Sequence, residues 1–347
     1  MLYSISPSEK LQDQIQVLMI RANIPGQIQS VSPCATSGNN RTYRVVTTNS
    51  VLVAKQYFRH IDDSRDRLGT EFNFLKYAAI SAPGLAPAPL AIDREAGLGL
   101  YEFMQGDPIP VDGATLDRVQ SAVSFFLALN LPATRKQARE LPNASEACFS
   151  ISEHLNQISS RLCTLADQVP VVLENAAAHV CIQEIIDYWT KLSKHILTTA
   201  PLLGINPYDL LSQDQRCLSP SDFGFHNAML MPDQTVRFLD FEYAGWDDPA
   251  KMVGDFFSQL TVPVPKEYFQ DFLSAISVAF PDADQLVKRA SLLRPVYQVK
   301  WCCIALNIFL PVHLARRKFA NPHLNVIDLK RTQLSKAQSI MRSLTTI

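Results

Sequence analysis

An aspartate and an asparagine stand five residues apart in the stretch SPSDFGFHNAML, which covers residues 219–230. The carboxylate of Asp222 can accept a proton from an attacking hydroxyl group, and the side-chain oxygen of Asn227 can bind Mg²⁺. Both residue types are also common turn-formers in ordinary loops. The surrounding sequence must therefore distinguish a catalytic site from a simple turn.

A predicted β-hairpin follows and ends at a second acid. Residues 227–240, NAMLMPDQTVRFLD, are two apolar runs joined by a Pro-Asp-Gln turn, which is typical of a hairpin. Because a hairpin brings its two ends together, we expect Asn227 and Asp240 to reach one metal site. An amide oxygen, a carboxylate and substrate phosphates form a donor set that suits Mg²⁺.

A lysine and a glutamate farther upstream could handle phosphate. Lys55 lies in the apolar run VLVAKQYF, where strand alternation places it on the same face as Val51 and Val53. A buried lysine needs a partner, and Glu71 follows in a predicted helix. Such a pair can hold the α- and β-phosphates of ATP. Taken alone, Lys55 would more simply be a lysine whose charged end reaches solvent at the end of a strand.

A glycine turn precedes this strand in CATSGNNRTYRV. Gly38, between Ser37 and Asn39, predicts a tight turn whose backbone N–H groups could cover phosphates. The same sequence is typical of an ordinary hairpin turn. The chain has neither GxxxxGK[ST] nor GxGxxG, so its phosphate contacts must come from residues such as these.

The elements that would position these residues form two lobes of different composition. Predicted helices cover 8–22 and 63–81, and predicted strands fall within 27–58 (three), 88–93 and 98–104. Longer helical patterns then follow at 113–131, about 145–168, 172–199 and from about 264 to the end. We therefore predict an α+β, bilobal fold, with a small antiparallel β N-lobe at 1–105 and a larger, mainly helical C-lobe at 106–347.

Five segments, taken in order, resemble one known family: VLVAKQYF, TEFNFLKY, LYEFMQGDPIP, SPSDFGFHNAML and FLDFEYAGWDDPAKMVGDF. They look like the aminoglycoside phosphotransferase and choline kinase-like enzymes, a branch of the protein-kinase-like fold, over about residues 30–260. The resemblance implies ATP and Mg²⁺ as cofactors. It also implies that Asp222 is the catalytic base, that Asn227 and Asp240 are Mg²⁺ ligands, and that Lys55 and Glu71 are the phosphate-positioning ion pair.

The resemblance extends to supporting residues and includes one departure. It implies that the segment Tyr101-Glu102-Phe103 meets adenine through backbone groups, and that Asp255 in MVGDF braces the catalytic loop. The family usually has histidine two residues before the base, where this chain has Pro220. The only histidine in the motif is His226. We expect it either to contact the side chains that bind the substrate, without touching the substrate itself, or to face the substrate. The departure keeps a catalytically degenerate, nucleotide-binding regulator (pseudokinase) open as an alternative.

The acceptor is expected to be a small molecule with a hydroxyl group. A protein kinase would need a peptide-docking segment after Asp240, but a predicted helix begins within about ten residues, in GWDDPAKMVGDFF. Residues 286–347 contain eleven Lys and Arg and one acid, in a chain whose net charge is −1. This excess matches a polycationic aminoglycoside less well than a neutral or anionic compound, although a solvated basic face would look the same. A sugar, sugar derivative or amino alcohol is the expected acceptor class.

Two segments are candidates to line the acceptor pocket: the aromatic stretch KEYFQDF at 266–272 and PVYQVKWCCIALN at 295–307. Lys300 and Asn307 are the polar candidates within the second segment. Helix-surface or core-capping roles are equally open for both.

Composition limits the remaining classes. The chain is 47% hydrophobic and 19% charged, as expected for an ordered globular protein. Its seven cysteines are scattered and include no CxxC pair, which indicates buried thiols in a reducing compartment. The N-terminus lacks a basic segment followed by an apolar one, and no uninterrupted apolar run reaches about 18 residues. We expect a soluble, cytoplasmic protein with no membrane span and no nucleic-acid partner.

Overall fold

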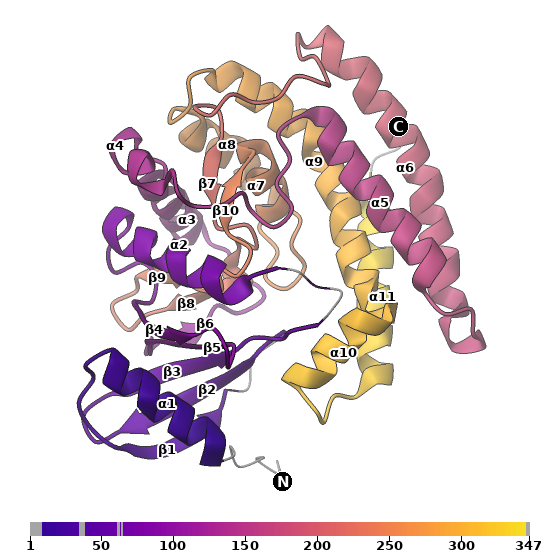
Figure 1. Ribbon diagram of the computed structural model, residues 1–347. Helices are drawn as coiled ribbons and strands as arrows, with labels where there is room; N and C mark the ends of the chain where they lie inside the picture. The colour runs from indigo at the N-terminus through magenta and orange to yellow at the C-terminus, as the bar shows by residue number, and fades with distance from the viewer. Residues whose placement is uncertain (1–8, 35–38, 61–62, 64, 345–347) are drawn as a thin grey trace.

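The computed structural model describes residues 9–34, 39–60, 63 and 65–344. The N-terminal part is a five-stranded antiparallel sheet in the order β1-β2-β3-β5-β4 (Figure 1). The strands are β1 (Ile28–Pro33), β2 (Arg41–Thr47), β3 (Val51–Gln56), β4 (Pro89–Asp93) and β5 (Leu98–Glu102). The predicted three strands and later pair are therefore confirmed.

Two helices cover opposite faces of this sheet. Helix α1 (Glu9–Arg21) packs Ile15 and Leu18 against a cluster that includes Leu52 of β3. Helix α2 (Arg67–Ser81) contacts β4 and β5 on the other face and also packs with the C-terminal part (Figure 1). Since side chains alternate along a strand, Lys55 lies on the face opposite Leu52, toward α2 and the space between the lobes.

The remainder of the chain is mainly helical, as predicted. Its helices are α3 (Leu116–Leu129), α4 (Pro132–Arg135), α5 (Ile151–Gln168), α6 (Ala176–Leu202), α7 (Pro249–Phe256), α8 (Phe269–Ser277), α9 (Ala283–Leu306), α10 (Pro311–Ala320) and α11 (Val326–Ser343). Short strands are β6 (Asp107–Pro108), β7 (Cys217–Ser219), β8 (Ala228–Leu230), β9 (Val236–Phe238) and β10 (Gly245–Asp247). Helix α9 lies at the centre and packs against α5, α6, α7, α8 and α11 (Figure 1). Strand β6, just after the predicted lobe boundary, pairs with β8. The predicted boundary at 105/106 itself stays a prediction.

Aromatic packing joins the two lobes beneath the candidate site. The rings of Phe125 and Phe238 stack with centroids 4.7 Å apart, and Phe241 stacks on Phe74 of α2 at 5.0 Å. Phe223, inside the stretch 219–230, lies 4.9 Å from Phe238. Burial of such large rings fixes the backbone that carries them, so this stretch rests on a rigid base.

A buried ionic network anchors α7 to the surrounding helices. Asp248 caps α7 and accepts hydrogen bonds from Arg289 (2.5 Å) and His154 (2.9 Å). Asp247 pairs with Lys251, and these carboxylates and Lys251 are fully buried. Burial raises the free-energy cost of removing one partner from such a pair, so α7 holds a defined orientation.

Three expectations outside the site can be compared with the structure. Phe269 and Phe272 of the stretch 266–272 pack in the core against Phe256 and Phe257, so these rings do not line the cavity described below. All seven cysteines are free; five are buried, Cys34 is half-buried and Cys163 is exposed. Among the described residues, no single helix is long and apolar enough to cross a membrane, and only the bent pair Ala283–Phe309 and Pro311–Ala320 reaches that length and composition together.

Candidate active site

The loop that carries Asp222 is fixed on both sides. Asn130, at the end of α3, donates to the carbonyl of Leu218 (3.1 Å) and accepts from its N–H (2.9 Å), which holds β7. Phe223 and Phe225 are buried. The preceding residue, Ser221, has φ 69°, a left-handed backbone that is rare outside glycine. These constraints hold the Asp222 side chain, one third exposed, at the end of the loop.

The predicted hairpin is present and brings the two predicted metal ligands to one end. Ala228 pairs with Phe238, and the N–H of Leu239 donates to the carbonyl of Asn227 at 2.8 Å. The Asn227 amide nitrogen donates to the Asp222 carbonyl at 2.9 Å, so its oxygen remains the atom that could bind a metal. Asp240 follows with φ 65°. Left-handed residues at Ser221 and Asp240 place backbone strain on both sides of the site, as functional sites often do.

Lys55 forms the ion pair that the sequence predicts, and a second one as well. Its Nζ lies 2.7 Å from Glu71 Oε2 and 2.6 Å from Asp240 Oδ1. Burial lowers the pKa of Lys55, but the carboxylates of Asp240 and Glu71 outweigh it and hold the pKa well above its usual value. Tyr57 donates to the same Glu71 oxygen at 2.5 Å. Strand β3 and helix α2 thus hold a charged lysine toward the catalytic loop.

The surroundings of Asp240 fit a bound cation. Burial raises the pKa of Asp240 to about 7; the carboxylates of Glu242 and Glu71 add to the rise and Lys55 opposes it. The three carboxylates of Asp240, Glu71 and Glu242 all lie close enough to Lys55 to raise its pKa. One amide oxygen from Asn227 and one carboxylate from Asp240 suit Mg²⁺, which keeps most of its shell for water and phosphate oxygens. No group of three or more His, Cys, Asp or Glu side chains in the described part of the chain forms an all-protein metal cage.

His226 contacts the predicted base directly. Its Nε2 lies 3.1 Å from Asp222 Oδ1, and its ring meets Trp301 edge-on with centroids 6.1 Å apart. Burial raises the pKa of Asp222, but His226 outweighs it and the pKa lies below the usual value. Burial lowers the pKa of His226, but Asp222 outweighs it and that pKa is raised. His226 therefore supplies a contact to the base from the C-terminal side of the loop, while Pro220 is buried on the other side.

Asp255 contacts helix α9, and its role as a brace of the loop that carries Asp222 stays a prediction. Its carboxylate accepts from Lys300 Nζ (3.0 and 2.8 Å) and from Trp301 Nε1 (3.0 Å), both on α9. Asp255 therefore orients Trp301, and Trp301 contacts His226. Among the described residues, Asp255 is linked to Asp222 through this series of contacts. Helix α7, which carries Asp255, is therefore connected to the site through α9.

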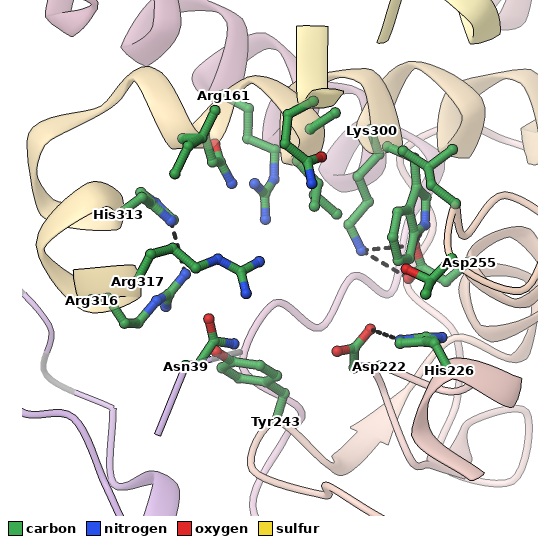
Figure 2. Close-up of a pocket in the computed structure, with 18 of the residues that line it drawn as sticks. Asn39, Arg161, Asp222, His226, Tyr243, Asp255, Lys300, His313, Arg316 and Arg317 are labelled. Carbon is green, nitrogen blue, oxygen red and sulfur yellow. Dashed lines mark hydrogen bonds and ion pairs between the residues drawn. The ribbon is translucent and has the colours of Figure 1, made fainter. Parts of the chain in front are cut away.

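A cavity of about 320 Å³ opens beside Asp222 (Figure 2). Lys300 and Asn307, the polar candidates from sequence, both line it. Asn39 also lines it, and its amide oxygen is buried without a hydrogen-bond partner. The remaining polar side chains of the wall are Arg65, Ser145, Glu146, Arg161, Ser221, Asp222, His226, Tyr243, Asp255, Thr261, His313, Arg316, Arg317, Gln333 and Lys336.

The other predicted nucleotide contacts are placed only in part. Ser37 and Gly38 lie outside the described residues. The N–H of Glu102 donates to the Ala88 carbonyl, and its carboxylate accepts from the Ala88 N–H, both at 3.0 Å. An adenine would have to use other backbone groups of this segment, so the roles of Glu102 and Phe103 stay predictions.

Several residues of the site were not singled out from sequence. No local sequence motif marks Asn130, because its partner Leu218 lies far from it in the chain. In the sequence, Arg316 and Arg317 belong to the basic C-terminal region, and no pattern marks Arg161 or His313. The adjacent arginines in ARRK were the one local signal, but sequence alone does not show which face of a helix meets a cavity.

Comparison with known proteins identifies the class. A family model described as the phosphotransferase enzyme family matches residues 30–285. Because this match covers more than half of the chain, the protein belongs to that family, and the predicted enzyme class is confirmed. No curated protein matches the chain.

Solved structures confirm the predicted protein-kinase-like fold. A choline kinase from Cryptosporidium parvum aligns with a TM-score of 0.58 at 12% identity, covering 96% of each chain. The aminoglycoside phosphotransferase APH(2")-IIa, in complex with gentamicin, aligns at 0.60 and 14%, covering 98% of each chain. ADP-bound APH(2'')-Ib aligns at 0.54 and 13%, covering 95% of this chain and 99% of the other. These identities are low enough that the likeness is one of fold.

Proposed function

We propose that this protein is an ATP-dependent small-molecule kinase that transfers a γ-phosphoryl group to a hydroxyl group of a neutral or anionic metabolite. The observation that carries the proposal is the position of Asp222. It lies between the carboxylate–lysine cluster (Lys55, Glu71, Asn227 and Asp240) and a cavity of about 320 Å³. Cavities of this size commonly bind small molecules.

The proposed chemistry assigns each side chain one task. Asp222 orients the acceptor hydroxyl and takes its proton, and its lowered pKa keeps it ionised at neutral pH. Lys55 contacts the departing phosphates, with Glu71 holding it in place. Asn227 and Asp240 would hold Mg²⁺, which when bound offsets charge on the phosphate oxygens. Most of the rate acceleration would come from positioning and electrostatics.

Nucleotide use is supported by the family match and by the similar fold of APH(2'')-Ib, which was solved with ADP. The test is a screen of hydroxylated metabolites for ADP release, followed by the Asp222→Asn variant. We expect the variant to lower turnover by about 10²–10⁴-fold and to retain ATP·Mg²⁺ binding by calorimetry. Wild-type turnover in this variant would remove Asp222 as the base.

Pro220 favours a second candidate, a nucleotide-binding regulator that does not transfer phosphate. A thermal-shift series with ATP, with and without Mg²⁺, measures nucleotide binding directly. Binding combined with no ADP release from any acceptor, in both wild type and Asp222→Asn, would support the regulator. Failure to bind nucleotide would contradict both candidates.

A further inference from the structure

The cavity beside Asp222 carries more positive than negative side chains. Its lining contains six Lys or Arg and three Asp or Glu. The cations come from separate parts of the chain: Arg65, Arg161 of α5, Lys300 of α9, Arg316 and Arg317 of α10, and Lys336 of α11. Figure 2 shows the guanidinium groups of Arg161 and Arg317 pointing into the space that Asp222 borders from another side.

Some of these charges are already neutralised within the protein. Arg65 pairs with Asp63, Arg161 with Glu146, and Lys300 with Asp255. Removal of Arg161 would leave Glu146 unpaired, whereas Asp63 would keep Arg67 and Asp255 would keep Lys251. The three paired cations form the wall of the cavity and are part of its packing.

Arg316 differs from the paired cations. Its guanidinium lies 2.8 Å from the neutral acceptor His313 Nδ1, and its Nε is buried without a hydrogen-bond partner. In the described part of the chain, no carboxylate lies within ion-pair distance of Arg316. Arg316 is half-buried, and a partly desolvated charge without a counter-charge is unfavourable, so this arrangement suits a site whose counter-charge arrives with a ligand.

The electrostatics of the neighbouring side chains agree with this geometry. Burial, followed by the charges of Arg316, Arg161, Arg65 and Arg317, lowers the pKa of His313 to about 3. Burial and then Arg316 also lower the pKa of Arg317. The cavity therefore has a positive electrostatic potential even with His313 neutral.

Helix α10 is held in place by the N-terminal lobe, so its arginines are preorganised. Arg41 of β2 donates to the carbonyl of Phe319 at 2.9 Å, and its guanidinium lies 4.3 Å from the Phe319 ring centroid. The ring of Phe58 meets Phe319 edge-on at 5.5 Å. A cation held in this way loses less conformational entropy when it binds a ligand.

We infer that the acceptor carries a phosphate or carboxylate group, which binds Arg316 and Arg317 while the hydroxyl group to be phosphorylated lies at Asp222. The inference rests on the proposed function and names the acceptor class of that same site. Guanidinium groups match the planar or multi-oxygen geometry of carboxylate and phosphate through paired N–H donors. An acceptor that is a free amine or quaternary ammonium would be repelled by the same wall.

The first experiment measures anion binding without any transfer. Inorganic phosphate is titrated calorimetrically into protein saturated with a non-hydrolysable ATP analogue and Mg²⁺, so that the nucleotide site is filled. We expect Arg316→Gln/Arg317→Gln to weaken phosphate binding by about 10–100-fold, as expected for loss of charged hydrogen bonds. Lys318→Gln, which removes one positive charge at an exposed position of α10, is the control and should bind as wild type does.

Two results of this titration would overturn the inference. One is phosphate binding that is equal in wild type and in the double variant. The other is an equal loss of affinity for the ATP analogue, which would assign the arginines to the nucleotide. Thermal unfolding of each single variant, Arg316→Gln and Arg317→Gln, measures whether the fold is retained.

The second experiment measures ADP release with acceptors in matched pairs: glycerol and glycerol 3-phosphate, glucose and gluconate, with choline as the cationic comparison. We expect the anionic member of a pair to have the higher kcat/KM, and Arg317→Gln to reduce that preference by at least about tenfold. Transfer to neutral or cationic acceptors alone would overturn the acceptor class and leave the kinase intact. A protein that binds no ATP·Mg²⁺ would instead contradict the proposed function.

Discussion

The carboxylate–lysine cluster and the arginine-lined cavity meet at Asp222 but are built differently. The cluster comes from β3, α2 and one hairpin, and its charged side chains already contact one another: Lys55 bridges Glu71 and Asp240 at 2.7 and 2.6 Å. The cavity wall comes from α5, α9, α10 and α11, and Arg316 lacks a carboxylate partner among the described residues.

This difference separates two tasks. The cluster carries its own counter-charges, so its geometry does not depend on which acceptor is present. The cavity leaves positive charge for a ligand to complete. We therefore expect changes in the cluster to lower turnover for every acceptor, and changes in the cavity to alter which acceptor is used.

Within the carboxylate–lysine cluster, the largest expected effect is that of Asp240→Asn. Loss of the carboxylate removes one proposed Mg²⁺ ligand, and metal stabilisation of transition-state charge is worth several kcal/mol, so kcat should fall by about 10²–10³-fold. ATP affinity should lose its dependence on Mg²⁺, which calorimetry with and without the metal measures. Asp233→Asn, an exposed acid in the turn of the same hairpin, is the control and should leave both quantities unchanged. Retained Mg²⁺ dependence in Asp240→Asn would place the metal elsewhere.

The second effect tests the Lys55–Glu71 pair. Glu71→Gln preserves shape but removes the charge that holds Lys55, which then keeps only Asp240. We expect kcat/KM for ATP to fall about 10–100-fold, since charged hydrogen bonds contribute about 1.5–3 kcal/mol. Tyr57→Phe removes a neutral donor to the same oxygen, together with the hydrogen bond between Tyr57 and Tyr101, and a loss of about threefold is expected. Steady-state kinetics at varied ATP distinguish the two, and equal losses would show that packing, rather than charge, matters at Glu71.

A third and smaller effect lies at the border between the two regions. His226→Phe keeps an aromatic ring beside Trp301 but removes the hydrogen bond to Asp222. We expect kcat to fall about tenfold, the lower end for a hydrogen bond to a charged group, with acceptor KM little changed. His226→Gln restores a donor and should recover most of the loss. If both variants are equally impaired, His226 acts through packing. It then does not take the place of the histidine that the family usually has where this chain has the buried Pro220.

The sequence predicted the cluster far better than the cavity, for a physical reason. Lys55, Asp222, Asn227 and Asp240 stand in local patterns, and hairpin geometry alone brings Asn227 and Asp240 together. Arg316 is different, because its position in the cavity depends on how α10 packs relative to α9 and the N-terminal lobe. The five sheet strands and most helices follow from local periodicity in the same way. The contacts of Asp255 were likewise not predicted, because its partners Lys300 and Trp301 lie on α9, whose orientation is set by tertiary packing.

The smallest predicted effect concerns pH and the half-buried His313. Its folded pKa of about 3 lies below the unfolded value of about 6.5, so the folded state binds fewer protons than the unfolded state between these values. His313 therefore leaves stability intact above about pH 6.5 and reduces it as the pH falls below that value. Urea unfolding at pH 7.5 and 5.5 should show a loss that is larger in wild type than in His313→Asn by up to about 1 kcal/mol.

The comparison with His313→Asn isolates the titration of His313. The pKa of buried His154 is also lowered, but His154 changes the stability in the same direction in both proteins, so its contribution cancels. The amide oxygen that this substitution introduces could still accept the hydrogen bond from Arg316, so packing changes little. An equal loss in the two proteins would show that the arginines do not depress the pKa of His313. Saturating phosphate should shrink the difference, because an anion in the cavity offsets the charge of Arg316 and Arg317 and so raises the pKa of His313 toward its usual value.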